Sequence, residues 1–256
     1  MQPLELYIHI PFCVKKCAYC DFLSGPAGEK EKEEYVKMLV DEIKNCPDTV
    51  QNYRVISIFF GGGTPSLLTG EQIGRLMDTV REIFTLDEDA EITMEMNPGT
   101  VTEEKLRKYR QAGVNRLSIG LQSVNDEELR LLGRIHTYEE FREAYHLARA
   151  NGFSNINVDL ISAIPGQTVE SWRRTLEQVM ALSPEHISAY SLILEEGTTF
   201  YKKYVEDEAK EGPKLPDEDA ERQMYWDTET LMEKNGYHRY EISNYAKEGY
   251  ACRHNL

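Results

Sequence analysis

Six short apolar runs alternate along the chain with longer segments of helical period. Several of these runs are almost continuously apolar, which is typical of strands in a parallel sheet that helices cover. Right-handed connections between such strands predict an α/β fold, a partial (open) parallel β/α barrel of about six βα units. The expected strands span residues 4–10, 55–60, 91–96, 116–121, 156–161 and 187–194.

Helices are expected between these strands, over residues 30–44, 70–84, 103–112, 138–150 and 169–182. Thr102 and Thr137 stand where helix N-caps belong, and Gly113 and Gly152 stand where helices end. We expect this barrel to occupy residues 1–198. Residues 199–256 would then hold a charged excursion without chemistry, a helix over 219–234 and the start of a C-terminal region that the chain truncates.

Composition excludes several classes of protein. The 256 residues are 41% hydrophobic and carry a net charge of −15, with 44 acidic and 29 basic side chains, so nucleic acid is a poor candidate partner. We see neither the basic stretch of a signal peptide at the N-terminus nor an apolar run long enough to span a bilayer. Five cysteines, three of them clustered, indicate reduced thiols that bind a metal in the cytoplasm.

The clustered cysteines are Cys13, Cys17 and Cys20, spaced C-x3-C-x2-C directly after the first expected strand. Zinc would need four ligands, and His9 sits in the strand, on the face of Tyr7, where a packed histidine is the simpler interpretation. A thioredoxin-like pair would leave Cys13 unexplained. The remaining interpretation is a [4Fe-4S] cluster with three protein thiolates and one iron open to a small molecule.

Polar residues follow the ends of the later strands. The second strand runs into "FFGGGTPS", whose glycines permit close approach of the backbone to a ligand. Because the carboxyl ends of parallel strands meet at one edge of a sheet, these polar groups are expected to gather above the cysteines. The candidates are Glu95 and Asn97 in "MEMNPG", Gln122 in "GLQS", Arg134 and His136 in "LGRIH", and Asp159 in "VDLISAIPGQT".

The cysteine spacing, with Tyr19 before the last cysteine, resembles the radical S-adenosylmethionine superfamily. This resemblance implies that the open iron binds the methionine moiety and that an electron cleaves the sulfonium to give a 5'-deoxyadenosyl radical. The segments "YIHIPFC", "FFGGGTPS", "GVNRLSIGLQS" and "LGRIH" resemble the oxygen-independent coproporphyrinogen III oxidase-like branch. The cofactor contacts that it implies are Tyr7, Tyr19, Gly62, Gly63, Thr64, Glu95, Gln122, Arg134 and Asp159; in the oxidases Gln122, Arg134 and Asp159 serve a second such molecule.

The sequence departs from the oxidases in two places. Phe22 stands where they carry a further cysteine, and the end "CRHNL" resembles the start of a motif of the branch's heme chaperones, which makes His254 a candidate heme ligand. The resemblance therefore favours a heme-trafficking protein that binds the cluster, S-adenosylmethionine and heme or porphyrin. Its other partners would be an electron donor and heme-receiving proteins. The alternatives are oxidative decarboxylation of coproporphyrinogen III and an enzyme for an unrelated substrate.

Overall fold

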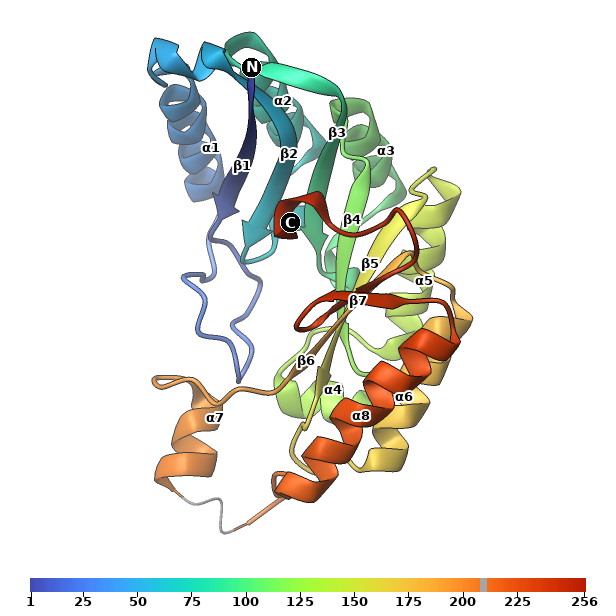
Figure 1. The fold of residues 1–256 in the computed structure, drawn as a ribbon. Helices are drawn as coiled ribbons and strands as arrows, with labels where there is room; N and C mark the ends of the chain where they lie inside the picture. Colours follow the sequence, from blue (N-terminus) through green and yellow to red (C-terminus); the bar gives the residue numbers. More distant parts are fainter. Residues whose placement is uncertain (208–210) are drawn as a thin grey trace.

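The computed structural model describes residues 1–207 and 211–256, so three residues of the expected excursion lie outside the described part. The described residues form an eight-stranded sheet in the order β1-β2-β3-β4-β5-β6-β8-β7, with helices packed against one face (Figure 1). Strands β1 to β6 pair in parallel, whereas β8 pairs antiparallel with both β6 and β7. The strands are β1 (Gln2–Ile10), β2 (Tyr53–Gly62), β3 (Thr85–Met96), β4 (Arg116–Gln122), β5 (Asn155–Ser162), β6 (His186–Ser191), β7 (His238–Glu241) and β8 (Asn244–Ala246).

The predicted partial barrel is confirmed, and each expected strand and helix is present with ends shifted by a few residues. Thr102 and Thr137 accept the capping hydrogen bonds from Lys105 and Glu140, and Gly113 ends its helix in the left-handed conformation. The α-helices are α1 (Glu29–Lys44), α2 (Gly70–Ile83), α3 (Glu103–Ala112), α4 (Asp126–Leu132), α5 (Tyr138–Ala150), α6 (Val169–Ala181), α7 (Thr199–Tyr201) and α8 (Glu218–Lys234).

The sheet separates apolar from polar side chains by simple alternation. On β3, Ile92 and Met94 are buried in the main hydrophobic core, while Glu91, Thr93 and Glu95 point to the opposite face. We call this opposite face the inner face. It carries polar side chains because no helix layer covers it. The functional groups described below come from this face or from the loops at the carboxyl ends of its strands.

The last part of the chain returns to the sheet. Helix α8 packs on α6, where the buried Trp172 donates its indole N–H to Thr228 Oγ1 at 2.9 Å. Strands β7 and β8 follow and extend the sheet beyond β6, and the C-terminal end then crosses in front of the strands (Figure 1). The sequence did not predict these two strands, whose place depends on pairing with β6.

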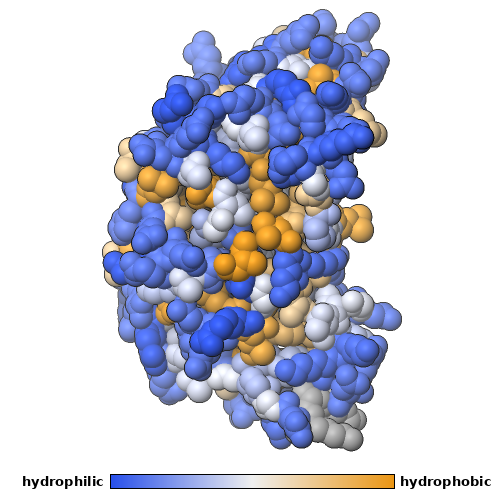
Figure 2. Space-filling model, turned by 180° about the vertical axis from the view of Figure 1, so that it is seen from behind, coloured by the Kyte–Doolittle hydropathy of each residue, from blue (hydrophilic) through white to orange (hydrophobic). Residues whose placement is uncertain are grey.

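The exterior agrees with the strongly negative net charge. The side opposite to that of Figure 1 is mostly hydrophilic, with hydrophobic residues gathered near its middle (Figure 2). Among the described helices, none has the length and apolar character needed to cross a membrane.

Candidate functional site

Residues 13–24, which we call the cysteine loop, are closed at their base by backbone hydrogen bonds. Cys13 N donates to Gly25 O at 2.9 Å, and Gly25 N donates to Pro11 O at 3.0 Å. The middle of the loop is held from the other side, because Ala18 N donates to Leu132 O at 2.9 Å. The cysteine loop therefore has a defined path between β1 and the end of α4.

The glycines after β2 lie directly against the base of this loop. Gly62 has a φ of +112°, and a Cβ on it would lie 2.4 Å from His9 Cε1. A Cβ on Gly63 would lie 2.6 Å from Phe12 O. The protein's own atoms occupy the space that side chains at these two positions would need. Approach of their backbone to a ligand stays a prediction. Glycine is required here by packing against the segment that leads into Cys13.

Hydrogen-bond donors approach two of the three sulfur atoms. Thr64 Oγ1 lies 3.6 Å from Cys13 Sγ, and Arg134 Nη1 lies 3.7 Å from Cys17 Sγ. Arg134 also donates through Nη2 to Gly120 O at 2.6 Å, while its buried Nε has no partner among the described residues. Donors and a positive charge beside sulfur stabilise thiolates, so these surroundings fit a group that three thiolates hold.

Burial raises the pKa of the third thiol, Cys20. All five cysteines of the chain are free. In the described part of the chain, no three His, Cys, Asp or Glu side chains converge around a position for one metal ion.

A pocket of about 370 Å³ lies between the cysteine loop and the carboxyl ends of the strands. Twelve of the predicted site residues share it: Cys13, Cys17, Tyr19, Cys20, Gly62, Gly63, Thr64, Glu95, Asn97, Gln122, Arg134 and Asp159. The expected gathering of strand-end polar groups above the cysteines is confirmed. Their contact with a cofactor stays a prediction.

Two carboxyl groups from separate strands face this pocket. Glu95 accepts a hydrogen bond from Gly62 N at 3.0 Å, and Asp159 accepts from Ser118 Oγ and Asn157 Nδ2, both at 2.8 Å. Burial, and then the charge of Asp159, raise the pKa of Glu95 to about 8. Burial also raises the pKa of Asp159 despite its hydrogen bonds. A cationic ligand would relieve this repulsion and favour both carboxylates.

The sequence did not predict a buried carboxylate that ties the pocket's loops together. Glu128 accepts hydrogen bonds from Ser123 Oγ at 2.6 Å and from Gln167 Nε2 at 2.9 Å. These bonds join the loop after β4 to the loop after β5, next to Gln122, whose φ of +75° is unusual for a residue with a side chain. The capping residue Asn125 and the pattern "DEELRLL" were the available signal for α4 and hence for Glu128.

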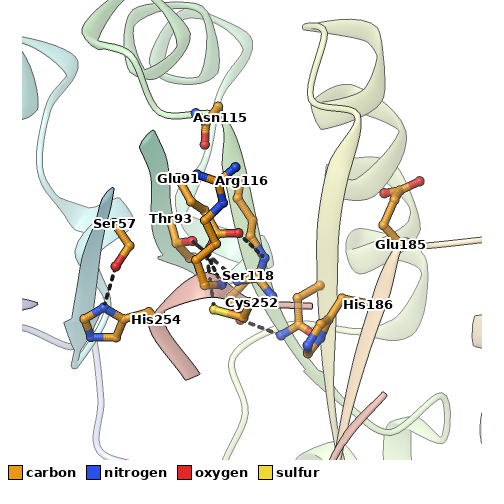
Figure 3. A network of polar contacts seen from close by, with 12 residues as sticks. Ser57, Glu91, Thr93, Asn115, Arg116, Ser118, Glu185, His186, Cys252 and His254 are labelled. Carbon is orange, nitrogen blue, oxygen red and sulfur yellow. Dashed lines mark hydrogen bonds and ion pairs between the residues drawn. The ribbon is translucent and has the colours of Figure 1, made fainter. Parts of the chain in front are cut away.

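Tyr7 and His254 do not belong to the described residues that line the pocket. They lie together on the inner face, where His254 Nδ1 is 3.2 Å from Ser57 Oγ. The imidazole is nearly parallel to the rings of Phe59 and Tyr7, with centroids 5.2 and 6.2 Å away. Figure 3 shows His254 beside Ser57 on β2, apart from the charged residues farther along the sheet.

The segment that carries His254 is anchored, whereas terminal residues are often poorly ordered. Glu91 Oε1 accepts hydrogen bonds from Arg253 N at 3.0 Å and from Cys252 Sγ at 3.4 Å (Figure 3). Arg253 also forms an ion pair with Asp89 at 2.9 Å. The polar inner face accounts for the difference, because Glu91 and its neighbour Arg116, 4.0 Å away, are buried beneath this segment.

Comparison with known proteins identifies the family. Residues 7–179 match the radical SAM superfamily. The chain belongs to this superfamily. Among solved structures, that of coproporphyrinogen III oxidase (HemN) from Escherichia coli, a radical SAM enzyme, superposes with a TM-score of 0.86 at 32% identity, covering 97% of this chain and 56% of that one. The predicted resemblance to the coproporphyrinogen oxidase-like branch is confirmed.

Two similar curated proteins carry another description. The heme chaperone HemW of Escherichia coli strain K12 is 44% identical over 100% of this radical SAM chain and 66% of its own length. The heme chaperone HemW of Bacillus subtilis strain 168 is 39% identical over 98% of this chain and 65% of its own length. The chain thus spans about two thirds of the relatives that it matches.

Proposed function

We propose that this protein takes part in heme trafficking on a radical SAM scaffold and binds a [4Fe-4S] cluster, S-adenosylmethionine and heme. The observation that carries the proposal is the single pocket that the three cysteines share with polar side chains from the ends of β2 to β5. The 44% identity to a heme chaperone over the whole chain supports the trafficking role.

Cys13, Cys17 and Cys20 would hold the cluster, with Thr64 and Arg134 donating to two of the sulfurs. When bound, the cluster supplies an open iron for the methionine moiety of S-adenosylmethionine and an electron for its sulfonium. To test for the cluster, the iron content of the protein is measured after reconstitution with iron and sulfide in the absence of oxygen. We expect about four iron atoms per chain and loss of the visible absorption in each Cys→Ala variant. Cys46→Ala, half-buried and distant in sequence, is the matched control.

S-adenosylmethionine carries two cationic groups, an ammonium and a sulfonium. Glu95 and Asp159, which face the pocket and repel one another, would stabilise such a ligand. We also propose Tyr19, Gly62, Gly63, Gln122 and Tyr7 as contacts, of which Tyr7 is the weakest because it lies outside the pocket. Binding is measured as a change in the electron paramagnetic resonance spectrum of the reduced cluster on addition of S-adenosylmethionine.

Heme would bind on the inner face at His254. The hydrogen bond between Nδ1 and Ser57 leaves Nε2 as the nitrogen free to bind iron. The rings of Phe59 and Tyr7 stack on the imidazole and make its surroundings partly apolar. We expect His254→Ala to change the heme absorption band of a chain extended to the length of the relatives, and equal spectra would place the ligand elsewhere.

The second candidate is oxidation of coproporphyrinogen III, which the TM-score of 0.86 to that oxidase favours. Phe22, in the position where the oxidases carry a further cysteine, favours the chaperone. Incubating reconstituted protein separately with heme, and with coproporphyrinogen III plus S-adenosylmethionine and a reductant, tests both. A decarboxylated product would support the oxidase, whereas stable heme binding without such a product would favour trafficking.

The remaining partners are proposed from the same role. Reduction of the cluster needs an electron donor, and trafficking needs proteins that receive heme. The five free cysteines suit a reducing compartment, which we propose is the cytoplasm. We also propose a domain boundary between residues 198 and 199. Whether residues 1–198 fold on their own tests this boundary.

A further inference from the structure

His9, on the inner face of β1, contacts three segments that belong to the site. Its Nε2 lies 3.1 Å from Leu23 O in the cysteine loop, and its Nδ1 lies 3.1 Å from Tyr7 Oη. Its ring fills the space beside Gly62, where a Cβ would come within 2.4 Å of Cε1. One imidazole thus contacts the cysteine loop, the glycines at residues 61–63 (which we call the glycine loop) and Tyr7 on the inner face.

The partners of His9 fix its tautomer. A carbonyl oxygen can only accept a hydrogen bond, so Nε2 carries the hydrogen and donates it to Leu23 O. Nδ1 is then the acceptor, and Tyr7 must donate its hydroxyl hydrogen. Both ring nitrogens of the neutral imidazole therefore have a hydrogen-bond partner. Tyr7 donates to His9, and His9 in turn donates to the cysteine loop.

Among the side chains that the structure describes, that of His9 is the one outside the cysteine loop that forms a hydrogen bond with residues 20–24. Leu23 lies three residues after Cys20 and is 85% exposed. In the described part of the chain, the other hydrogen bonds of residues 20–24 stay inside the loop, as in Lys16 Nζ to Phe22 O at 3.0 Å. Cys13 N is bonded to Gly25 O at the base of the loop, and the centre of the loop is bonded to Leu132 O.

Tyr7 is itself held in place from the side. Its ring lies nearly parallel to those of Phe59 and His254, with centroids 6.3 and 6.2 Å away. A Cβ on Gly61 would lie 2.9 Å from Tyr7 Cε2, so the ring also packs on the backbone of β2. The hydroxyl that bonds to His9 therefore comes from a ring that packs on these neighbours and is 52% exposed.

We propose that His9 is a positioning residue that tethers the Cys20 half of the cysteine loop, through Leu23 O, to the glycine loop and to Tyr7. The proposal deepens the proposed function, because a cluster on three thiolates requires all three sulfurs in fixed places. The tether itself exists in the metal-free protein, where it can be measured independently of the cluster.

The test measures how fast each cysteine of metal-free protein reacts with iodoacetamide, by mass spectrometry of peptides. We expect His9→Phe, which keeps a ring but loses both hydrogen bonds, to raise the alkylation rate of Cys20 about tenfold. The rate of Cys13 should stay within about twofold, because its tether to Gly25 is intact. His9→Gln, which keeps a donor for Leu23 O, should restore part of the protection. His146→Phe, on the exposed side of α5, is the matched control.

The result that overturns the proposal is a folded His9→Phe protein with the wild-type rate at Cys20, or an equal increase in His146→Phe. If His9→Phe does not fold, Tyr7→Phe decides, because it removes one hydroxyl and leaves the ring. A faster Cys20 in Tyr7→Phe supports the tether, and an unchanged rate rejects it. Wild-type protein that takes up no iron would reject the proposed cluster, while the alkylation rates would still judge the role of His9.

Discussion

The guanidinium of Arg134 donates to the sulfur of Cys17 over 3.7 Å, although 117 residues separate the two in the chain. The same side chain donates to Gly120 O on β4. Arg134 therefore connects the cysteine loop directly to the sheet. Its positive charge lies where the proposed cluster would place negative charge.

Replacing Arg134 by Met should destabilise the metal-free protein. The change keeps the length of the side chain but leaves Gly120 O without its charged donor, which costs about 1–3 kcal/mol in the free energy of unfolding. Urea unfolding followed by circular dichroism measures this loss. Arg130→Met, on the exposed side of α4, should stay within about 0.5 kcal/mol of wild type. Equal stability of Arg134→Met and wild type would contradict the connecting role.

Gly63→Ala should disturb the cysteine loop without any ligand present. The added Cβ would lie 2.6 Å from Phe12 O and 2.9 Å from Phe12 N, both backbone atoms, so the segment before Cys13 must move. We expect a loss of about 1–3 kcal/mol in stability and a lower iron content after reconstitution. Gly74→Ala, in the middle of α2 with open space around its Cα, should instead stabilise the protein by about 0.5–1 kcal/mol. A Gly63→Ala protein as stable as wild type would show that the segment before Cys13 can shift without a loss of stability.

The pKa of Glu95, raised to about 8, predicts that stability depends on pH. Between the ordinary value of 4.5 and 8, the folded protein holds a proton that the unfolded chain has released. Stability should therefore fall as the pH rises through this window. Between pH 6 and 9 the wild type should lose about 1–3 kcal/mol more than Glu95→Gln, which cannot ionise. Thermal unfolding at both pH values measures the difference, and Glu143→Gln, on the surface of α5, should behave as wild type.

A cationic ligand should reverse part of this effect. Because an ammonium or sulfonium favours the ionised carboxylate, the affinity for S-adenosylmethionine should rise between pH 7 and 9. The rise should be absent in Glu95→Gln. Parallel pH profiles for the two proteins would mean that the ligand does not meet this carboxyl group.

Glu91→Ala should release the end of the chain from the inner face. The change removes the acceptor for Arg253 N and Cys252 Sγ and leaves the buried Arg116 without its nearest acidic side chain. Digestion by a carboxypeptidase, followed by intact mass, should remove the last residues faster than in wild type. Glu88→Ala, three residues earlier on β3 and exposed, is the control and should be digested at the wild-type rate.

Much of the fold was predictable because its signals are local. Apolar runs and helix caps such as Thr102 and Thr137 each depend on a few neighbouring residues, and these elements are present where the sequence placed them. Strands β7 and β8 were not predicted, because the short segments "HRYE" and "NYA" become strands by pairing. Strand β8 pairs with β6, and β7 pairs with β8. Such pairing joins residues far apart in sequence, which local patterns do not report.

The candidate site was predictable to the same extent. The polar residues at strand ends gather in one pocket because parallel strands end at a common edge, a rule that needs no coordinates. The packing role of Gly62 and Gly63 was not predictable, since only the packed structure reveals that His9 and Phe12 occupy the space beside them. The hydrogen bond between His254 and Ser57 joins residues 197 positions apart, so local sequence patterns could not predict it.

The anchored end of the chain has a consequence for the order of folding. Residues 252–255 bond to Glu91 and Ser57, on strands that are synthesised long before them. The inner faces of β2 and β3, with Glu91 still in water, therefore stay open until another 161 to 197 residues have been synthesised. During that interval the outer face can already pack on its helices. Folding should be biphasic as a result, with a slow last step that closes the inner face.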